Sequence, residues 1–397
     1  MTFLSHLSKN ERYCAILCLA VWSGKPLVAY LGTIVYKIAG EVISEIVISS
    51  IYVILVLLCF SYIARTVHKS VYLLYFFLLS IFILSCGFHP DNTLLLEMVF
   101  DFPIIVLPYL FIGYVYDVER LFKPMYLLSV ASILVQAFYV FFIIPKVATN
   151  LDGVEDHMAA AYATLPHVLL IVWYTLKNTK AFNFIMSIMS FIVLFAMGTR
   201  GPIIFALLFI ALYLLYILFR NTKKTAKLLV ITVFSIILIN IEAIINYLSI
   251  FVERAGGSMR VFDIMDQFEI GEDVSSLARI EIINTLIDSI QSNWLTGLGM
   301  GGDRLIIGGY AHNLLIELLV SYGYIGGIAF FIALCLLIYK ANNKTSNEYE
   351  KSFLLLLVII GFISLFISNS YLQNPWFFFL IGYSLRLLYK RTSYRLC

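Results

Sequence analysis

The sequence predicts an all-α, polytopic integral membrane protein with about twelve transmembrane helices and one large extracytoplasmic loop that carries amphipathic helices. Composition is the first reason: 61% of the 397 residues are apolar and 13% are charged, whereas soluble domains are about half apolar and about a quarter charged. The second reason is that unbroken apolar runs recur from residue 13 to residue 389. Strands of a membrane β-barrel are short and alternate apolar with polar residues, so these runs indicate helices. A water-soluble enzyme is excluded.

Individual helices are predicted from runs of roughly 20 apolar residues, the length that crosses a bilayer. Runs without a charged residue predict spans at 46–64, 70–88, 124–145, 181–199, 201–219 and 318–339. Runs with one or two polar interruptions predict spans at 13–35, 97–116, 158–176 and 228–250. The charge-free stretch 352–385 is too long for one span, and Pro375 predicts a break within it because proline cannot continue a helix.

The placement of Lys and Arg predicts the orientation of these helices. Nineteen of the 27 basic residues lie in the seven segments on one side, and eight lie in the six segments on the other. Because cytoplasmic loops carry the excess of positive charge, both termini are expected in the cytoplasm. The chain then divides into helices 1–9 in residues 1–250, a large outer loop at 251–311, and helices 10–12 in residues 312–397. The net charge of +3 is too small to indicate a nucleic-acid partner.

Within the outer loop, residues 274–292 predict an amphipathic helix. Ile283, Leu286 and Ile290 recur at helical spacing, and Arg279 lies off this apolar stripe. Six glycines follow between positions 297 and 309, and they predict a flexible backbone segment. The chain is expected to re-enter the membrane at His312.

Arginines on the outer side are candidates for binding an anionic substrate. Arg200 stands in the tight turn 198–202 between two charge-free spans, where glycines on both sides leave its guanidinium accessible. The outer loop adds Arg254, Arg260, Arg279 and Arg304. A cluster of guanidinium groups suits a pyrophosphate, which each can bind with two parallel hydrogen bonds. The alternative for each arginine is a solvated or interfacial side chain without a role in binding.

The start of the predicted tenth helix carries the candidate base. His312 lies at this start, beside Tyr310, and Asn313 and Glu317 share one helix face because they are four residues apart. A histidine titrates near neutral pH and can take a proton from a sugar hydroxyl, although it could also be a capping or interfacial residue. Weaker outer-side candidates are Lys37, His89, Asp91, Glu97, Asp101, Asp152, Glu155, Asp156 and His157. No spacing of His and carboxylates indicates a metal site.

Three segments in this order carry a resemblance to a known family. They are GTRG at 198–201, SSLARIEIINTLIDSIQSNWLTGLGMGG at 275–302 and AHNLLIELLVSYGYIGG at 311–327. Together they resemble the O-antigen ligase and polymerase superfamily of bacterial envelope glycan synthesis. The resemblance implies that Arg200 and Arg279 bind the pyrophosphate of an undecaprenyl-linked glycan and that His312 is the key polar residue.

The resemblance also implies the reaction and the compartment. We expect a metal-independent glycosyltransferase of the bacterial inner membrane that uses no cofactor, in which Arg200 and Arg279 hold the leaving pyrophosphate and His312 is the base. The expected substrate-binding residues are Arg254, Arg260, Tyr310, Asn313 and Glu317, of which Asn313 or Glu317 would orient His312. The expected partners are undecaprenyl-pyrophosphate-linked oligosaccharides and membrane lipids, with a chain-length regulator and a flippase.

Three functions remain open at this stage. The preferred one is an O-antigen polymerase, which transfers one lipid-linked glycan to a second lipid-linked repeat unit. The first alternative is an O-antigen ligase, which delivers the glycan to the lipid A-core. The second alternative is a flippase or polysaccharide exporter without chemistry. An exporter would be expected to carry charged residues along the middle of several spans, whereas the polar residues here lie mostly at the outer side.

Overall fold

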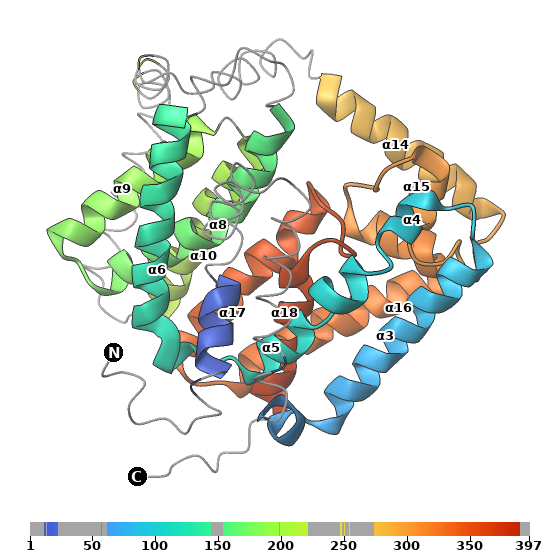
Figure 1. Cartoon of the computed structure of the whole chain (residues 1–397), viewed down its shortest axis with the longest axis horizontal. Helices are drawn as coiled ribbons and strands as arrows, with labels where there is room; N and C mark the ends of the chain where they lie inside the picture. The colour runs from blue at the N-terminus through green and yellow to red at the C-terminus, as the bar shows by residue number, and fades with distance from the viewer. Residues whose placement is uncertain are drawn as a thin grey trace. The chain divides into compact units, whose positions relative to one another are not determined.

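The computed structural model describes residues 62–143, 154–197, 199–220 and 274–389, with 14–22 and the single positions 12, 57, 247, 250 and 254. Within these ranges all regular elements are helices (Figure 1). Six are long and apolar enough to cross a membrane: Lys69–Phe88, Val118–Phe141, Ala159–Lys177, Arg200–Leu218, Leu314–Lys344 and Glu348–Phe366. The predicted all-α class is confirmed. The expected spans at 13–35, 46–64 and 228–250 lie largely outside the described residues.

The chain forms two compact units that do not follow the order of the sequence. The first unit contains residues 1–18, 56–119 and 274–397, and the second contains residues 19–55 and 120–273. The first unit therefore joins helices from the early and the late parts of the chain. The boundaries expected at residues 250 and 311 came from the predicted membrane topology and not from the packing of helices.

The described helices of the second unit are α6 (Val118–Phe138), η3 (Tyr139–Ile143), α8 (Val154–Lys177), α9 (Ala181–Ala196) and α10 (Arg200–Arg220). They coincide with the spans predicted around 124–145, 158–176, 181–199 and 201–219. Polar side chains inside this unit bond to one another: Ser129 Oγ accepts from Trp22 Nε1 at 2.9 Å and lies 3.1 Å from His167 Nδ1. These three buried polar side chains thus satisfy one another, as an apolar surrounding requires.

The first unit contains the remaining described helices. They are α3 (Lys69–Phe88), α4 (Thr93–Glu97), η2 (Phe102–Val106), α5 (Tyr109–Val115), α14 (Val274–Gln291), α15 (Gly302–Ile307), α16 (Leu314–Lys344), α17 (Glu348–Gly361), η5 (Ile363–Phe366) and α18 (Pro375–Tyr389). The span expected at 97–116 is shorter and interrupted: after α4 ends at Glu97, the apolar stretch Phe102–Val115 consists of η2 and α5. Pro103 and Pro108 lack the backbone N–H that a continuous helix needs, so each begins or interrupts an element. The break before Pro375 is confirmed.

Two glycines bring α5 and α18 into close contact. A Cβ at Gly113 would lie 2.2 Å from Phe379 O, and a Cβ at Gly382 would lie 2.0 Å from Leu110 O. Because a side chain at either position would collide with backbone, glycine sets this helix crossing. Small residues serve the same purpose in other membrane helix pairs. The crossing fixes α18, and with it the linker 367–374 that precedes α18.

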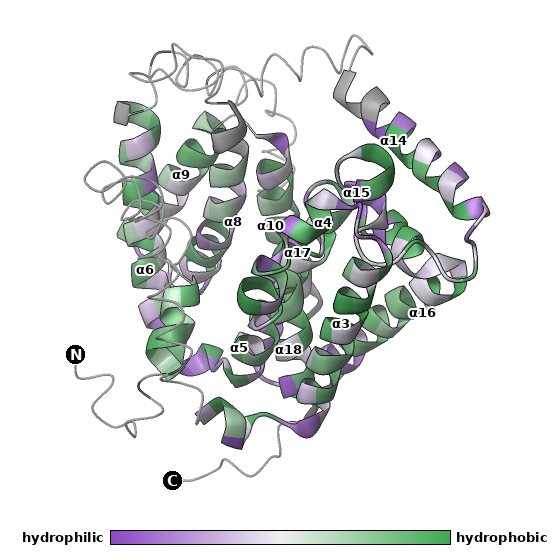
Figure 2. Ribbon diagram, turned by 45° about the vertical axis from the view of Figure 1, so that its right-hand side comes forward, coloured by the Kyte–Doolittle hydropathy of each residue, from purple (hydrophilic) through white to green (hydrophobic). Residues whose placement is uncertain are grey.

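Helix α14 confirms the predicted amphipathic helix. Leu286 and Ile290 are fully buried and pack against Ala311, Leu319 and Val320 around the start of α16. The polar side chains Glu281 and Asp288 are exposed on the opposite face. Figure 2 shows this mixture of polar and apolar positions along α14, in contrast to the mainly apolar surface of α3. The apolar stripe therefore docks α14 onto the protein.

The glycine-rich segment after α14 is ordered, so the prediction of a flexible segment is wrong. It docks on a kink in α16 at Gly323, which has φ +71° and ψ 176°. Leu298 N donates to Val320 O at 2.7 Å and Gly299 N donates to Ser321 O at 3.1 Å. Tyr324 N donates to Trp294 O at 2.8 Å. These bonds satisfy the backbone groups that the kink removes from the helix.

The contact between Gly297 and Gly323 leads to a stability prediction. A Cβ at Gly297 would lie 2.4 Å from Gly323 N, and its φ of +69° is a left-handed conformation that side chains disfavour. Gly297→Ala should therefore lower the free energy of unfolding by about 2–4 kcal/mol, combining overpacking with backbone strain. Thermal unfolding in detergent measures it. Gly309→Ala is the matched control, because a Cβ there meets nothing within 4 Å. Equal unfolding temperatures for the two variants would contradict the docking role of Gly297.

Candidate active site

The start of α16 is built by Asn313, which caps the helix. Asn313 Oδ1 accepts from Leu315 N at 3.0 Å and from Ile316 N at 3.3 Å. The preceding residue, His312, has a φ of +52°, in the left-handed region that residues other than glycine rarely adopt. The side-chain oxygen of Asn313 thus caps the helix, and the backbone turns at His312 just before it.

His312 lies in a half-buried position suited to a base. Its ring packs on Tyr310, with 4.2 Å between ring centroids and 47° between the planes. Its Nδ1 is buried and has no hydrogen-bond partner among the described residues. Burial lowers the pKa of His312 below its ordinary value, and the positive charge of Arg279 lowers it further. The imidazole is therefore neutral at pH 7 and able to accept a proton.

Arg279 reaches this site from α14. Its charge acts on both His312 and Tyr310, although it stands more than thirty positions earlier in the chain. The burial of Leu286 and Ile290 on the same helix holds the arginine in place. Three residues proposed from the sequence, Arg279, Tyr310 and His312, thus interact electrostatically where α14 packs on the start of α16.

Glu317 and Arg304 occupy the interior beneath this site. Glu317 is 1% exposed, and its Oε2 accepts from Tyr371 N at 3.1 Å while Oε1 accepts from Ser370 Oγ. Arg304 is 5% exposed and bonds Asp303 Oδ1 at 3.0 Å. Both charged groups are engaged by protein atoms. In this structure, Glu317 therefore does not make the expected contact with a substrate, and Arg304 does not make the expected contact with a pyrophosphate, because both side chains already bond to protein atoms.

Arg200 lies in the second unit, at the first position of α10. Helix α9 ends at Ala196 and α10 begins at Arg200, while Gly198 of the predicted turn lies outside the described residues. Packing explains why residue 201 is a glycine: a Cβ there would lie 2.2 Å from the hydroxyl oxygen of Tyr162 on α8. The glycine thus admits Tyr162 against the start of α10, whereas the sequence suggested that it exposes the arginine. Arg200 itself is partly exposed.

The other sequence candidates are spread over several places. Arg254 is exposed, although its neighbours in the chain lie outside the described residues. Asp91, Glu97 and Asp101 are also exposed. His89 caps the C-terminus of α3. Lys37, Asp152 and Arg260 lie outside the described residues, as do the side chains of Glu155, Asp156 and His157.

Sequence reasoning missed the residues that hold the glycine-rich segment and the linker in place. Ser85 Oγ accepts from Met300 N at 2.9 Å, and Asn92 Nδ2 donates to Gly301 O at 2.8 Å. Ser370 lies in the linker before α18 and accepts from Arg304 at 2.8 Å. Serine and asparagine in such positions give no local signal, because their partners are more than sixty residues away in the chain.

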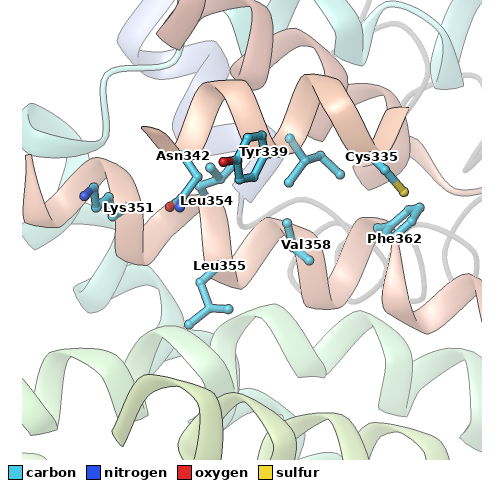
Figure 3. Close-up of a pocket in the computed structure, with 9 residues that line it drawn as sticks. Cys335, Tyr339, Asn342, Lys351, Leu354, Leu355, Val358 and Phe362 are labelled. Atoms are coloured by element: carbon cyan, nitrogen blue, oxygen red, sulfur yellow. The ribbon is translucent and has the colours of Figure 1, made fainter. Parts of the chain in front are cut away.

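Two further observations bear on the chemistry. Among the described residues, no group of three or more His, Cys, Asp or Glu side chains could hold a metal ion. A pocket of about 380 Å³ opens between α16 and α17 (Figure 3), lined by Cys335, Ile338, Tyr339, Asn342, Lys351, Leu354, Leu355, Val358 and Phe362. This lining supplies neither a carboxylate nor an imidazole, so the pocket offers no base comparable to His312.

Comparison with known proteins supports the resemblance found in the motifs. A family model described as O-antigen ligase matches residues 185–331, less than half of the chain. The matched segment contains Arg200, Arg279 and His312. Neither the curated proteins nor the solved structures give a match to this chain. The segment 185–331 is thus similar to the O-antigen ligase family, as the motifs indicated.

Proposed function

We propose that the protein is a metal-independent glycosyltransferase of the bacterial inner membrane that acts as an O-antigen or related surface-polysaccharide polymerase. Its donor is an undecaprenyl-pyrophosphate-linked glycan, and its acceptor is a second lipid-linked repeat unit. The observation that carries this proposal is the electrostatic interaction of Arg279 with His312, whose buried Nδ1 has no partner among the described residues. A cation that can hold a pyrophosphate thus lies next to a neutral base.

The reaction follows from these two groups. The acceptor hydroxyl oxygen forms a bond to the anomeric carbon of the donor sugar, and its proton passes to the neutral imidazole of His312. The bond from that carbon to the pyrophosphate oxygen breaks, and the electron pair leaves with undecaprenyl pyrophosphate. Arg279 stabilises the negative charge on this leaving group, which therefore needs no proton. The role of Arg200 in the same step stays a prediction from the resemblance.

A ligase is the second candidate, because the matching family model is described as O-antigen ligase. It would use the same donor and the same base and differ in the acceptor, the lipid A-core. The test is reconstitution of the purified protein with a lipid-pyrophosphate oligosaccharide. Dimers and longer ladders support the polymerase. Transfer that requires added lipid A-core supports the ligase, and movement of the donor across the membrane without transfer would contradict both.

Orientation is part of this proposal, because the site must face the outer leaflet. At the end of the first unit opposite His312, Lys344 ends α16, and Arg386 of α18 pairs with Asp117 at 3.6 Å. Basic residues at this end support a cytoplasmic location for it.

The orientation predicts the accessibility of single cysteines in a chain whose native cysteines are replaced. A cysteine at Asn293, which is exposed just after the end of α14, should react with a membrane-impermeant thiol reagent added to intact cells. A cysteine at Ser346, equally exposed at the opposite end, should react only after the membrane is opened. Labelling of position 346 in intact cells would reverse the orientation and contradict a site on the outer side.

A further inference from the structure

Asp303, Arg304, Glu317 and Ser370 form a buried polar network beneath the candidate active site. Arg304 NH1 lies 3.0 Å from Asp303 Oδ1 and 3.6 Å from Glu317 Oε1, and Arg304 NH2 donates to Ser370 Oγ at 2.8 Å. Asp303 and Ser370 have no exposed surface. The guanidinium thus joins α15 to α16 and to the linker before α18. Buried polar side chains on three segments are thus held together by one central guanidinium group.

The network holds the backbone on which His312 stands. Asp303 Oδ2 accepts from Ala311 N at 3.0 Å, while Oδ1 accepts from Arg304 N and from its side chain. Ala311 is 1% exposed and lies between the two aromatic residues of the site, Tyr310 and His312. The Asp303 carboxylate therefore fixes the peptide directly before His312, while Arg304 fixes the carboxylate.

The linker is held in the same way on the other side of the site. Ser370 bonds both Arg304 and Glu317, and Tyr371 N donates to Glu317 Oε2. The backbone of the adjacent residue, Asn369, interacts with the hydroxyl group of Tyr310. Asn369 has a φ of +73° and His312 a φ of +52°, both in the left-handed region. Such strained conformations persist where surrounding contacts determine them, and they are concentrated at functional sites.

We propose that Asp303 is a positioning residue for the transfer reaction: through the Ala311 amide it sets the direction of the His312 imidazole, and Arg304 holds Asp303 in place. This inference rests on the proposed function, since it assigns to Asp303 an effect that acts through His312. Asp303 touches no substrate. Its contribution is to keep the base within reach of the acceptor hydroxyl, where a displacement of about 1 Å can lower the rate by about 10²-fold.

The test is a double-mutant cycle on the purified full chain in lipid vesicles, with a lipid-pyrophosphate oligosaccharide as donor. Asp303→Asn loses one carboxylate acceptor and the ion pair with Arg304. It should lower kcat by about 10²-fold and leave the donor KM within about twofold of the wild type, because Arg279 is untouched. In the His312→Ala background, Asp303→Asn should change the residual rate by less than about twofold, since residues that act as a unit are not additive.

Two further variants make the result decisive. Ser370→Ala removes a smaller group of the same network and replaces Asp303→Asn in the test if that variant does not fold. Its effect on the rate should depend on His312 in the same way. Glu350→Gln is the matched control, because Glu350 is a buried carboxylate that accepts from Thr345 at the opposite end of the first unit. It should alter the unfolding temperature without altering kcat.

The outcomes separate this inference from the proposed function. If Asp303→Asn keeps the wild-type kcat, or lowers the rate by the same factor in both backgrounds, Asp303 is not a positioning residue, and the proposed function stands. If the wild-type protein transfers no glycan, the proposed function fails. If His312→Ala alone keeps the wild-type rate, His312 is not the base, and the inference about Asp303 fails with it. A loss in the wild-type background that disappears in the His312→Ala background supports the inference.

Discussion

Replacing His312 with alanine should reduce glycan transfer by roughly 10²–10⁴-fold, the usual contribution of a positioned general base. The protein should remain folded and inserted, because His312 is half-buried before the helix and Asn313 still caps α16. Lipid-linked single repeat units should accumulate on the outer leaflet, because the donor is still made and still bound. The measurement is the rate of transfer in vesicles, together with the donor KM, which should change little.

The control for His312 is a histidine at the other end of the same unit. His68 accepts from Ser70 N at the start of α3 and stacks on Tyr389 at 4.4 Å between ring centroids. His68→Ala should leave transfer unchanged apart from a loss of stability. Long polymer made by purified His312→Ala would contradict the role of this histidine, and lipid-linked units trapped on the cytoplasmic side would indicate a transporter.

Replacing Arg279 with alanine should weaken donor binding by about 10–100-fold, the loss expected for a charge-assisted hydrogen bond. It should also move the pH dependence of the rate. Burial and the charge of Arg279 lower the pKa of His312, so its imidazole stays neutral to a lower pH than an ordinary histidine does. Without Arg279 the pKa of His312 rises, and activity should be lost at a higher pH as the solution is acidified. The donor KM and the acid limb of the pH profile measure the two effects.

Arg279→Lys separates charge from geometry. It keeps the positive charge beside His312, so the acid limb should stay near its wild-type position, while the loss of the two-pronged guanidinium should still weaken binding of the pyrophosphate. Arg65→Ala is the control, because Arg65 is an exposed arginine near the start of α3 at the opposite end of the unit. An unchanged donor KM in Arg279→Ala would remove Arg279 from the binding site.

Much of the fold could be predicted because its signals are local. Apolar runs and helical periodicity placed α3, α8 and α10 within a few residues, and they placed the amphipathic α14 on its correct apolar face. Pro375 placed the break before α18, because proline acts within its own turn. The order of the motifs around Arg200, Arg279 and His312 was enough to indicate the superfamily.

The tertiary structure decided how these elements meet. The kink at Gly323 exists because the glycine-rich segment supplies bonds to Val320 and Ser321, and that segment is ordered for the same reason. The roles of Arg304 and Glu317 were decided by their burial with Ser370. Sequence alone could show that an arginine and a histidine are present. Only the packing of distant segments decides which of them is enclosed by protein groups and which faces a substrate, because burial and hydrogen bonding depend on partners far away in the chain.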